Sequence, residues 1–519
     1  MYLFVILCTL IAIPVVILVR WRKKTFEYFK NIGIPGPEPN IIWGNLLEYH
    51  RNGRDIALKR WYDKYGKVFG FYNGDVPTLV VNDIDFLNYV FVTNFKNFAD
   101  RGITMGSDQE HSYIGQAMVH AKEPQWRILR SITSKEFTSH KLKRMMPHLV
   151  EQADIFMDVL GKLADEGRQA SMDDAFQALS LDFLCRAAFG IDTDFQHNLA
   201  CPFYAKAKNV VPGLMKGFFH AVAQSTTTLG KVMKPFFWLN KILGNFSTEI
   251  FSREMKKVVK LRTQNTATRQ SDMLQNLLEA EVHAIHLYNG RTLKNKNNSE
   301  NGKLENVRHL SEEEVALLTT VLLVGDFQTT SVTLSFISLL LAMHPEIQEK
   351  VRMEVKVATE SSGCLDYDTV IQKLKYTRQV IYETLRLYPP SVTFHTRTAK
   401  ESFEYKNKTF KAGTCILAPV LQLHQDPDYW PEPSKFDPDR FGPENEGRYC
   451  KAAFQPFGIG PRCCVGYNLA VLQVLYFTAR MVANFKMELG ESQKGAIRTR
   501  NVGMMGMLEN GPWIKFTRL

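Results

Sequence analysis

One loop near the C-terminal end reads Phe457-Gly-Ile-Gly460-Pro-Arg462-Cys463-Cys464-Val-Gly466 and leads directly into the apolar segment Tyr467 to Phe477, which we expect to be helical. A cysteine just before a helix lies close to backbone N–H groups and to the positive end of the helix dipole, and both favour the thiolate. Gly460 and Gly466 permit backbone conformations or close approaches that a Cβ atom forbids. Because soft transition metals bind cysteine as the thiolate, the loop indicates a metal-thiolate site.

Two other interpretations of this loop are a cysteine that only packs and a zinc site. Most buried cysteines are small apolar side chains that bind nothing. The loop, however, has the ten-residue spacing Phe-x-x-Gly-x-Arg-x-Cys-x-Gly, and the sequence has no Cys-x-x-Cys pair or Cys/His cluster that would form a zinc site. A single thiolate without a second protein ligand indicates haem iron. The loop resembles the haem-binding loop of the cytochromes P-450, the haem-thiolate monooxygenases.

Further segments resemble the same family, in the expected order along the chain. Glu383-Thr-Leu-Arg386 resembles its Glu-x-x-Arg motif, in which i,i+3 spacing puts the carboxylate and the guanidinium on one helix face. Phe436-Asp-Pro-Asp-Arg440-Phe resembles the segment whose arginine joins that pair, and Trp126-Arg-Ile-Leu-Arg130 resembles the Trp-x-x-x-Arg of a haem-contacting helix. Arg397 lies where the family often supplies another haem contact. Each match is weak alone, because Glu-Arg pairs are common on surfaces, but together they identify the chain as a member of the family.

The resemblance implies a haem cofactor and a role for each of these residues. Cys464 is the implied axial ligand of the iron, because it stands two residues after Arg462 and two before Gly466, which makes Cys463 only its neighbour. Electron donation from such a thiolate favours O–O cleavage. The implied structural ion-pair network consists of Glu383, Arg386 and Arg440. The implied haem contacts are Phe457 near the sulfur and the propionate partners Trp126, Arg130, Arg397 and Arg462.

Chain length alone, 519 residues, predicts two or more domains. The resemblance implies instead one large, mainly α-helical catalytic unit with a small β-rich region, behind an N-terminal transmembrane helix. We therefore expect a membrane anchor at residues 1–19, a basic and proline-rich linker at residues 20–40, and a haem-thiolate catalytic domain at residues 41–519.

The N-terminal segment Met1 to Val19 is almost wholly apolar and is followed by Arg20, Arg22, Lys23 and Lys24. This length is sufficient to cross a bilayer. A cleaved signal peptide is the alternative, but no basic region precedes the segment and no small-residue cleavage pattern follows it. The positive-inside rule then keeps the catalytic domain cytosolic, on a single-pass anchor in the endoplasmic reticulum membrane.

The cysteines and glycosylation sequons bear on this orientation. The eight cysteines are scattered without the spacing of a disulfide framework, which fits a reducing compartment. The three Asn-x-Ser/Thr sequons, at Asn245, Asn297 and Asn407, face the cytosol in this topology. We therefore expect all three to be unmodified.

Several local structures can be predicted. The three prolines of Gly33 to Pro39 favour an extended spacer, and Thr78 to Val81 is typical of a strand. Apolar periodicity predicts amphipathic helices over Glu151 to Phe189 and Phe251 to Leu287. The low-complexity stretch Asn289 to Asn306 predicts a mobile surface loop.

A long apolar helix is expected to open at a capping box, Ser311 to Glu314, and to run to about Met343. In the family this helix crosses the distal side of the haem. Because polar residues such as Asp326, Gln328 and Thr329 interrupt it, we do not interpret it as a second membrane span.

The same helix departs from the family pattern Ala/Gly-Gly-x-Asp/Glu-Thr-Thr/Ser, since the chain has Gly325-Asp-Phe-Gln-Thr-Thr330. Thr329 matches the threonine that supports proton delivery in the family. Gln328 stands where the family has an acid and cannot relay protons as a carboxylate does. Asp326, three residues before Thr329 on nearly the same face, is either a substitute acid or a structural residue.

The formal net charge is +11, but the basic residues form no arginine-rich tract and no nucleic-acid motif, so we expect no nucleic-acid partner. Basic residues can instead attract anionic lipid near Arg20 to Lys24 and an acidic redox partner. The candidates for the partner surface are Arg127, Lys135, Lys141, Lys143, Arg144, Arg448 and Lys451. The candidate substrate-lining segments are Gly102 to Met118, Val210 to Phe237 with Phe218, Phe219, Phe236 and Phe237, Ser391 to Phe394, and Val502 to Met505.

The resemblance and the N-terminal segment together imply a membrane-anchored monooxygenase that inserts one oxygen atom of dioxygen into an apolar substrate such as a xenobiotic, steroid or fatty acid. Its electrons are expected from NADPH through a flavoprotein reductase, with a cytochrome b-type protein as a further donor. The resemblance is greatest to the microsomal xenobiotic-metabolising group of animals. The alternatives are a haem-thiolate isomerase or dehydratase of lipid peroxides, which a weak proton relay would suit, and a non-catalytic haem sensor or carrier.

Overall fold

The structure is a computed structural model that describes residues 2–51, 53–102, 114–212, 218–243, 247–265, 269–283, 307–447, 450–493 and 495–519. Within these ranges the chain is mainly helical with small β-sheets, as the resemblance implies. The helices are α1 Tyr2–Phe26, α2 Tyr28–Asn31, α3 Leu46–Arg51, α4 Arg54–Tyr65, α5 Ile84–Asn88, α6 Gln125–Ser134, α7 Ser139–Asp165, α8 Asp173–Phe189, α9 Pro202–Lys208, α10 Phe218–Ser225, α11 Lys234–Ile242, α12 Ser247–Gln264, α13 Met273–Glu279, α14 Glu312–Met343, α15 Pro345–Ser362, α16 Tyr367–Lys373, α17 Lys375–Leu387, α18 Val420–His424 and α19 Tyr467–Asn484. The strands are β1 Val68–Asn73, β2 Val76–Val81, β3 Gln169–Ser171, β4 Glu281–His283, β5 Val307–His309, β6 Thr396–Thr398, β7 Phe403–Tyr405, β8 Lys408–Phe410, β9 Cys415–Leu417, β10 Phe485–Leu489, β11 Thr499–Val502, β12 Met505–Leu508 and β13 Trp513–Arg518.

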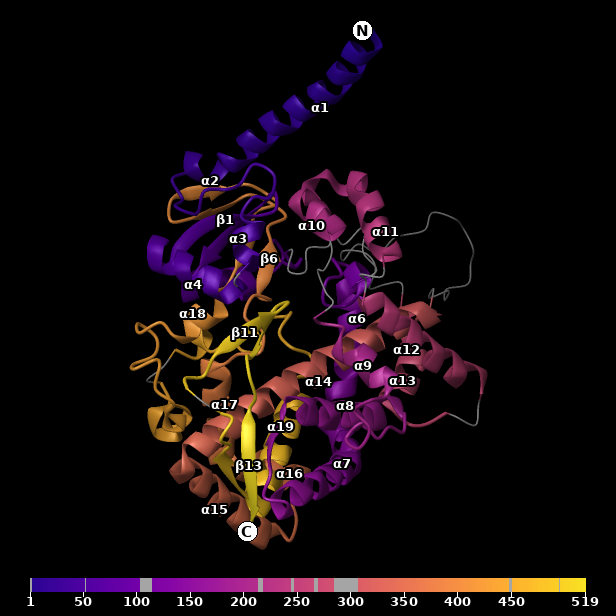
Figure 1. Cartoon of the computed structure of the whole chain (residues 1–519), viewed down its shortest axis with the longest axis vertical. Helices are drawn as coiled ribbons and strands as arrows, with labels where there is room; N and C mark the ends of the chain where they lie inside the picture. The colour runs from indigo at the N-terminus through magenta and orange to yellow at the C-terminus, as the bar shows by residue number, and fades with distance from the viewer. Residues whose placement is uncertain are drawn as a thin grey trace, which may run out of the picture.

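The largest described sheet has the strand order β1-β2-β9-β6 and lies with α3 and α4 beside the base of α1 (Figure 1). β1 and β2 form an antiparallel hairpin, whereas β2 runs parallel to β9. The strand predicted at Thr78 to Val81 lies in β2, which confirms that prediction. β6 pairs with β9 so that Arg397 stands opposite Ile416, which holds Arg397 inside the fold.

A second sheet has the order β10-β13-β3 and joins distant parts of the chain. The central strand, β13, covers Trp513–Arg518 and pairs with β10 on one side and with β3 on the other. Thus Trp513 stands opposite Ser171, near the start of α8. The C-terminal segment is therefore an internal part of the fold.

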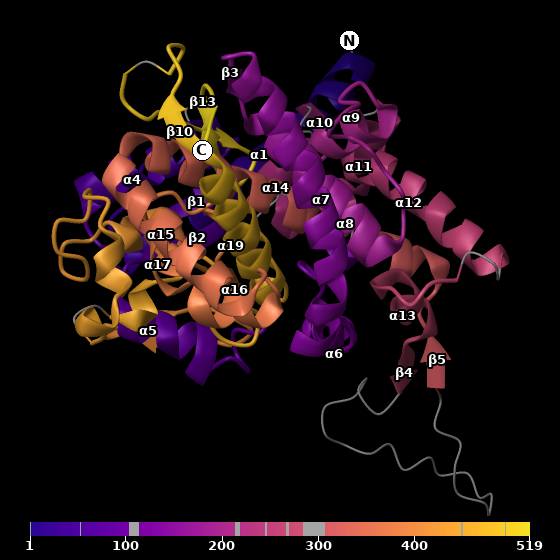
Figure 2. The same cartoon turned by 90° about the horizontal axis from the view of Figure 1, so that it is seen from below.

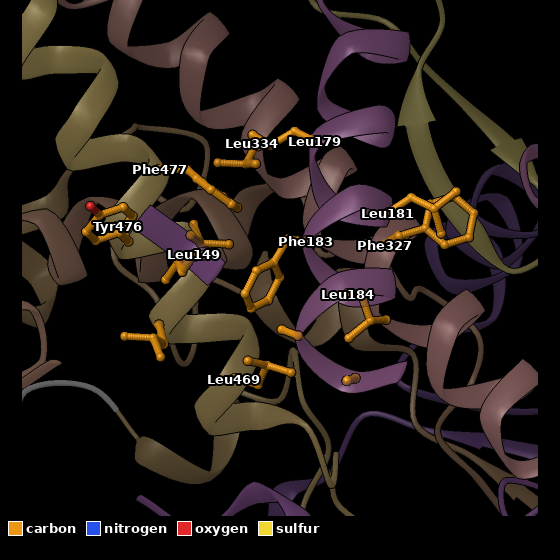
Figure 3. Packing of buried hydrophobic residues seen from close by; sticks show 14 of the residues in the cluster. Leu149, Leu179, Leu181, Phe183, Leu184, Phe327, Leu334, Leu469, Tyr476 and Phe477 are labelled. Atoms are coloured by element: carbon orange, nitrogen blue, oxygen red, sulfur yellow. The ribbon is translucent and has the colours of Figure 1, made fainter. Parts of the chain in front are cut away.

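Helix α14 is the central element of the helical region. Its capping box is complete, because the Ser311 hydroxyl accepts from the Glu314 N–H at 3.2 Å while the Glu314 carboxylate accepts from the Ser311 N–H at 2.9 Å. The helix ends at Met343, ahead of Pro345, so the predicted bounds are confirmed. Figure 3 shows how its side chains Phe327 and Leu334 pack with side chains of the neighbouring helices α8 and α19. Figure 2 shows these helices crossing in one bundle.

Two predicted helices are shorter than their apolar periodicity suggested. The segment Glu151 to Phe189 is divided between α7 and α8 by a turn at Gly167, which has φ +63°, and by the short strand β3. The segment Phe251 to Leu287 contains α12, α13 and β4, and its last residues lie outside the described ranges. Periodicity missed both breaks because the apolar residues on either side belong to one core. The stretch Asn289 to Asn306 also lies outside the described residues.

Helix α1 projects away from the rest of the molecule (Figure 1). At its base, Arg20, Lys23 and Lys24 are exposed, whereas Arg22 is buried and donates to the Ile42 carbonyl. Among the described residues, one helix is long and apolar enough to cross a membrane, and that helix is α14. In its most apolar 18-residue stretch, 67% of the residues are buried inside the protein, which is the pattern of a core helix.

The proline-rich segment after α2 is extended and packs on the sheet. Ile34 is buried, and the Pro35 carbonyl accepts from the Gly70 N–H of β1 at 2.8 Å. A Cβ atom at Gly36 would lie 1.8 Å from the Gly70 carbonyl oxygen, so this close approach requires glycine. The segment thus connects α1 and α2 to β1 by direct contact.

Candidate metal centre

The cysteine loop, Phe457 to Gly466, is a tight turn held by its own backbone. The Cys464 N–H donates to the Phe457 carbonyl at 2.8 Å, and the Cys463 N–H donates to the Gly460 carbonyl at 3.0 Å. The Phe457 ring lies edge-on to the ring of Tyr467, the first residue of α19, with 4.7 Å between centroids. These contacts place Cys464 immediately before α19.

Of the two glycines predicted to be necessary in this loop, only one is at a position that excludes a Cβ atom. Gly460 has φ +73°, and a Cβ atom there would lie 2.0 Å from the Phe91 carbonyl oxygen. Glycine is therefore required at this position, as predicted. Gly466 has φ −89°, and the nearest neighbour of a Cβ atom would be Phe137, at 3.6 Å. The prediction is wrong for Gly466 in the described structure, because its backbone is of an ordinary kind and a Cβ atom has room.

The Cys464 side chain is accessible although protein surrounds it. Burial raises the pKa of Cys464 to about 11, against smaller lowering effects from the Gly466 N–H and from Arg130. The expected help from the helix start is present, and desolvation is the larger effect on the pKa of the thiol. An exposed residue that protein surrounds lines open space rather than packed atoms.

Helix α14 has an open position of the same kind. Gly325 is exposed in the middle of an otherwise largely buried helix, and a Cβ atom there would meet nothing within 4 Å. The Thr329 hydroxyl, one turn later, donates to the Gly325 carbonyl at 2.7 Å. Gln328 points elsewhere, because it is buried and donates from Nε2 to the Lys208 carbonyl at 3.1 Å.

Asp326 bridges α14 and α19. Gln473 Nε2 lies 2.9 Å from Oδ1 and 3.0 Å from Oδ2 of Asp326. Burial raises the pKa of Asp326 to about 7, while the hydrogen bond from Gln473 lowers it. The charge of Asp326 in turn raises the pKa of Cys464, so the carboxylate lies near the sulfur. This geometry fits both interpretations of Asp326, a structural bridge and an acid that exchanges a proton near neutral pH.

The predicted arginines gather beside the cysteine loop. Arg130 of α6 donates to the Cys463 carbonyl at 2.8 Å. Arg462 donates to the Ala121 carbonyl at 2.7 Å and lies over the Trp126 ring, 4.4 Å from its centroid. The predicted residues Trp126, Arg130 and Arg462 are therefore brought together.

Arg397 belongs to the same group. It is 2% exposed and lies 4.4 Å from the centroid of the Phe91 ring, and Gly460 packs against the Phe91 carbonyl. Burial and the charge of Arg462 lower the pKa of Arg397 to about 9. Because the charge of Arg462 acts on Arg397 in this way, the two guanidiniums lie close together.

Three further members of this group were not predicted from the sequence. Arg101 is buried, donates to the Val119 and Phe394 carbonyls, and has its pKa lowered by burial and by Arg397, Arg462 and Arg130. His120 and His395 are buried, and burial with nearby arginines lowers the pKa of each to about 3. Arg101 directly precedes Gly102, where a candidate substrate segment was expected to begin. A basic residue at that position was the sequence signal that could have pointed to Arg101 as part of the site.

The charges of this group require an anion. Four guanidiniums lie close to one another, three of them buried (Arg101, Arg397 and Arg462) and one half-buried (Arg130). Among the described residues, their ion pair with an acid is the 3.8 Å contact of Arg462 with Asp100. Arg397 Nε, Arg462 Nε and Arg462 Nη1 are buried without hydrogen-bond partners. Buried charges are costly unless they are paired. The group therefore fits the two propionates of haem, as the resemblance implied.

The metal ligands are consistent with haem as well. No group of three or more His, Cys, Asp or Glu side chains that could hold a metal ion occurs in the part of the chain that the structure describes. A metal bound at Cys464 would take its other ligands from a cofactor such as a porphyrin. The accessible sulfur, the open face of α14 and the cationic group together match that requirement.

The predicted ion-pair network lies behind the loop. Glu383 and Arg386 of α17 are fully buried and paired, and Arg440 Nε lies 3.3 Å from the same carboxylate. His424 connects this network to the segment just before the cysteine loop, because its Nδ1 is 3.0 Å from the Arg386 carbonyl and its Nε2 accepts from the Gln455 N–H at 2.9 Å. The network thus supports the loop from behind.

The candidate substrate segments meet in part. Ser391 bridges to Met505, and the Val392 N–H donates to the Met504 carbonyl at 3.2 Å. Met505 packs in one apolar cluster with Val211 and with residues of α14. Phe218, Phe219 and Phe236 form a separate aromatic chain in which Phe218 is largely exposed. Residues 103–113 and 213–217 and the Phe237 side chain lie outside the described structure.

Most of the candidate basic residues already have local partners. The ion pairs are Arg127 with Glu123, Lys141 with Glu136, Lys143 with Asp368 and Lys451 with Glu446. Arg144 donates to Ser271, Lys135 is exposed, and Arg448 lies outside the described residues. The pairs of Lys143 and Lys451 are exposed at both ends, and such pairs are weak.

Comparisons with known proteins identify the family. The family model "Cytochrome P450" matches residues 34–516. Cytochrome P450 3A41 of Mus musculus is 30% identical over 504 residues, covering 96% of this chain and 94% of the relative. Cytochrome P450 3A28 of Bos taurus is 31% identical over 485 residues, covering 92% of this chain and 89% of the relative. These relatives are animal proteins, in agreement with the resemblance noted from the sequence. The chain belongs to the cytochrome P450 family, whose members are haem-thiolate monooxygenases.

Proposed function

We propose that this protein is a membrane-bound monooxygenase that takes electrons from NADPH through a flavoprotein reductase and oxygenates an apolar small molecule. The observation that carries the proposal is the exposed Cys464 beside four arginines, three of them buried, a combination that suits a metal cofactor with two carboxylates. When bound, haem supplies the iron at which dioxygen is activated.

The residues of this chain would hold the cofactor and leave one side open. Cys464 would provide the axial thiolate, and Phe457 would pack near it. Arg397 and Arg462 have buried nitrogen atoms without partners, which can donate to carboxylates. Trp126 would support Arg462 from below, and Arg130 would hold the loop through the Cys463 carbonyl.

Thr329 and Asp326 are the proposed catalytic side chains for proton delivery. Thr329 lies one turn after the open position at Gly325, and Asp326 has a pKa raised to about 7 by burial. An acid with a pKa near the working pH is suited to proton exchange. Gln328 lacks that ability and points toward Lys208.

An apolar substrate is supported by the surroundings of one candidate substrate segment, Ser391 to Phe394. Ser391 bridges to Met505, which packs in one apolar cluster with Leu508, Val332 and Phe336. An apolar lining binds apolar molecules by removing their surface from water. Xenobiotics, steroids and fatty acids share this property.

Membrane attachment is supported by two features. Helix α1 projects from the molecule, with exposed Arg20, Lys23 and Lys24 at its base. Helices α10 and α11 lie on the same side of the molecule in Figure 1 and expose Phe218, Trp238 and Ile242. We infer a single-pass anchor at residues 1–19, the linker at residues 20–40, and a cytosolic catalytic domain at residues 41–519 on the endoplasmic reticulum membrane. Basic residues near the bilayer attract anionic lipid.

The redox partner would be an acidic protein. The residues near the cysteine loop include Lys135, exposed on the surface, and the weakly paired Arg127 and Lys451. Complementary charge steers such encounters. The flavoprotein reductase is the proposed main donor, and a cytochrome b-type protein is a second.

Reconstitution tests the proposal. The holoenzyme in phospholipid vesicles, with reductase and NADPH, should convert members of steroid, fatty-acid and drug-like panels to products that carry one atom of isotopically labelled dioxygen. Turnover of lipid hydroperoxide without reductase, and no product with it, would indicate the isomerase or dehydratase instead. Carbon monoxide binding without any product from either source would indicate a sensor or carrier.

A further inference from the structure

Helices α14 and α19 are joined by one side-chain contact close to the cysteine loop. The Gln473 amide, which is fully buried in α19, donates from Nε2 to both carboxylate oxygens of Asp326, at 2.9 and 3.0 Å. Cys464 lies just before the same helix α19. The contact therefore connects the helix that starts at the cysteine loop to the helix that carries Thr329.

The unused half of this amide is informative. Gln473 Oε1 is buried and has no hydrogen-bond partner in the described structure. An ionised carboxylate only accepts hydrogen bonds, whereas a protonated carboxyl group also donates one. Nε2 can therefore bond the charged form of Asp326, and Oε1, after a half-turn of the amide, can accept from its neutral form. The chain has a single residue here that can bond Asp326 in either state.

We propose that Gln473 is a positioning residue for proton delivery, holding Asp326 beside Thr329 in both its charged and its neutral form. This inference rests on the proposed oxygenation. It extends that proposal, because the proton-delivery residues proposed so far, Asp326 and Thr329, both lie in α14, whereas Gln473 lies in α19. The neighbouring geometry supports it, since the Thr329 hydroxyl bonds the carbonyls of Gly325 and Asp326, at 2.7 and 3.3 Å.

The surroundings of Asp326 make this contact decisive for its charge. Burial is the main cause that raises the pKa of Asp326, and the Gln473 hydrogen bond is the opposing cause. The titratable group that senses its charge is the Cys464 thiol on the cysteine loop. Leu181 of α8 packs beside Phe327, the residue after Asp326, in the same apolar cluster (Figure 3). Removing the Gln473 donor should therefore move the titration of Asp326 upward.

The experiment compares the wild-type holoenzyme with Gln473→Leu, which removes both amide atoms, and with the nearly isosteric Gln473→Glu. The protonated carboxyl group of Asp326 is followed by its infrared C=O band against pH and assigned by its loss in Asp326→Asn. We expect the wild-type band to titrate near neutral pH, the Leu variant to titrate at higher pH, and the Glu variant to titrate highest because a second carboxylate repels the charge. Thr478→Val, which removes another buried polar group of α19, should titrate like wild type.

A second readout is the fraction of NADPH that yields oxygenated product. In the Leu variant this fraction should fall several-fold and its solvent deuterium isotope effect should change, while Thr478→Val keeps both. If Leu and Glu variants titrate and couple like the control, Gln473 has no positioning role. If the Leu variant does not retain haem, the Glu variant alone decides by the same titration.

The two proposals fail in different ways. Absence of any oxygenated product from the wild-type protein with reductase and NADPH overturns the proposed function, whatever Asp326 does. Normal oxygenation by the wild type together with an unchanged Asp326 titration in the Gln473 variants overturns the inference alone.

Discussion

Arg386 binds both carboxylate oxygens of Glu383, from Nε to Oε2 and from Nη2 to Oε1, each at 2.7 Å, and neither side chain is exposed. The remaining Arg386 N–H groups donate to the carbonyls of His424, Pro433 and Lys435. One guanidinium therefore fixes three backbone points behind the cysteine loop.

Arg386→Ala should lower the stability of the protein by about 3–5 kcal/mol, because it leaves the Glu383 carboxylate buried and unpaired. Chemical unfolding and the haem content of the purified protein measure the effect. Lys257→Ala breaks an i,i+3 pair with Glu254 on the surface and should change stability by less than about 1 kcal/mol. An Arg386→Ala protein with full haem content and unchanged stability would contradict a structural role for the network.

Cys464→Ser should abolish the spectrum of carbon monoxide bound to a thiolate-ligated ferrous haem, whereas Cys463→Ala should retain it. The reason is that Cys464 is exposed and that the charge of Asp326 on α14 raises its pKa, which places Cys464 between the loop and that helix. Cys463 instead lies against Arg130, with its sulfur 3.9 Å from Nη2. The reverse pair of spectra would show that the ligand is Cys463.

Arg462→Leu should weaken haem binding by about 10- to 100-fold, because a charged hydrogen bond contributes about 1.5–3 kcal/mol. The rate and extent of haem transfer to a scavenging protein report the change. Arg168→Leu, which removes an exposed cation paired with Glu166, is the matched control and should bind haem normally. Equal haem retention in both variants would remove Arg462 from the cofactor contacts.

Most of what could be predicted depends on residues that are close together in the chain. The turn at Gly460, the capping box at Ser311 and the Glu383-Arg386 pair each follow from spacing within a few residues, because local backbone geometry determines which side chains meet. The structure agrees with each of them.

What could not be predicted depends on contacts between distant segments. Arg101, His120 and His395 reach the arginine group from loops that nothing in their local sequence connects. The contact of Gln473 with Asp326 requires knowing how α14 and α19 cross. The local effect predicted for Cys464 is present, since the Gly466 N–H lowers its pKa, but the larger desolvation by the surrounding fold could not be predicted from the loop.

His424 should make the protein less stable as pH falls from about 6.5 toward 3. Burial lowers the pKa of His424 to about 3, so the folded state keeps it neutral while the unfolded state takes up a proton near pH 6.5. Stability should then decrease by about 1.4 kcal/mol for each pH unit within this window. Chemical unfolding of the wild type and His424→Gln at several pH values measures the slope, which should be smaller in the variant.

The control for this titration is His148→Gln, because the His148 side chain is 41% exposed on α7. Equal slopes for His424→Gln and wild type would mean that His424 is not kept neutral by the fold.

Asn407 offers a test of membrane orientation. It is exposed in the turn between β7 and β8, with φ +58°, where a glycosylating enzyme in the lumen could reach it. Protein expressed in animal cells should show no mobility shift after endoglycosidase treatment. A shift that Asn407→Gln removes would place the catalytic domain in the lumen.

Because β13 is the middle strand between β10 and β3, the sheet beside α7 and α8 cannot close until residues 513–518 have left the ribosome. β3 and the helices α7 and α8 are synthesised much earlier, so their side of this sheet must wait unpaired while most of the chain is made. Substitutions that disrupt β13 should consequently impair maturation far more than their distance from the cysteine loop would suggest.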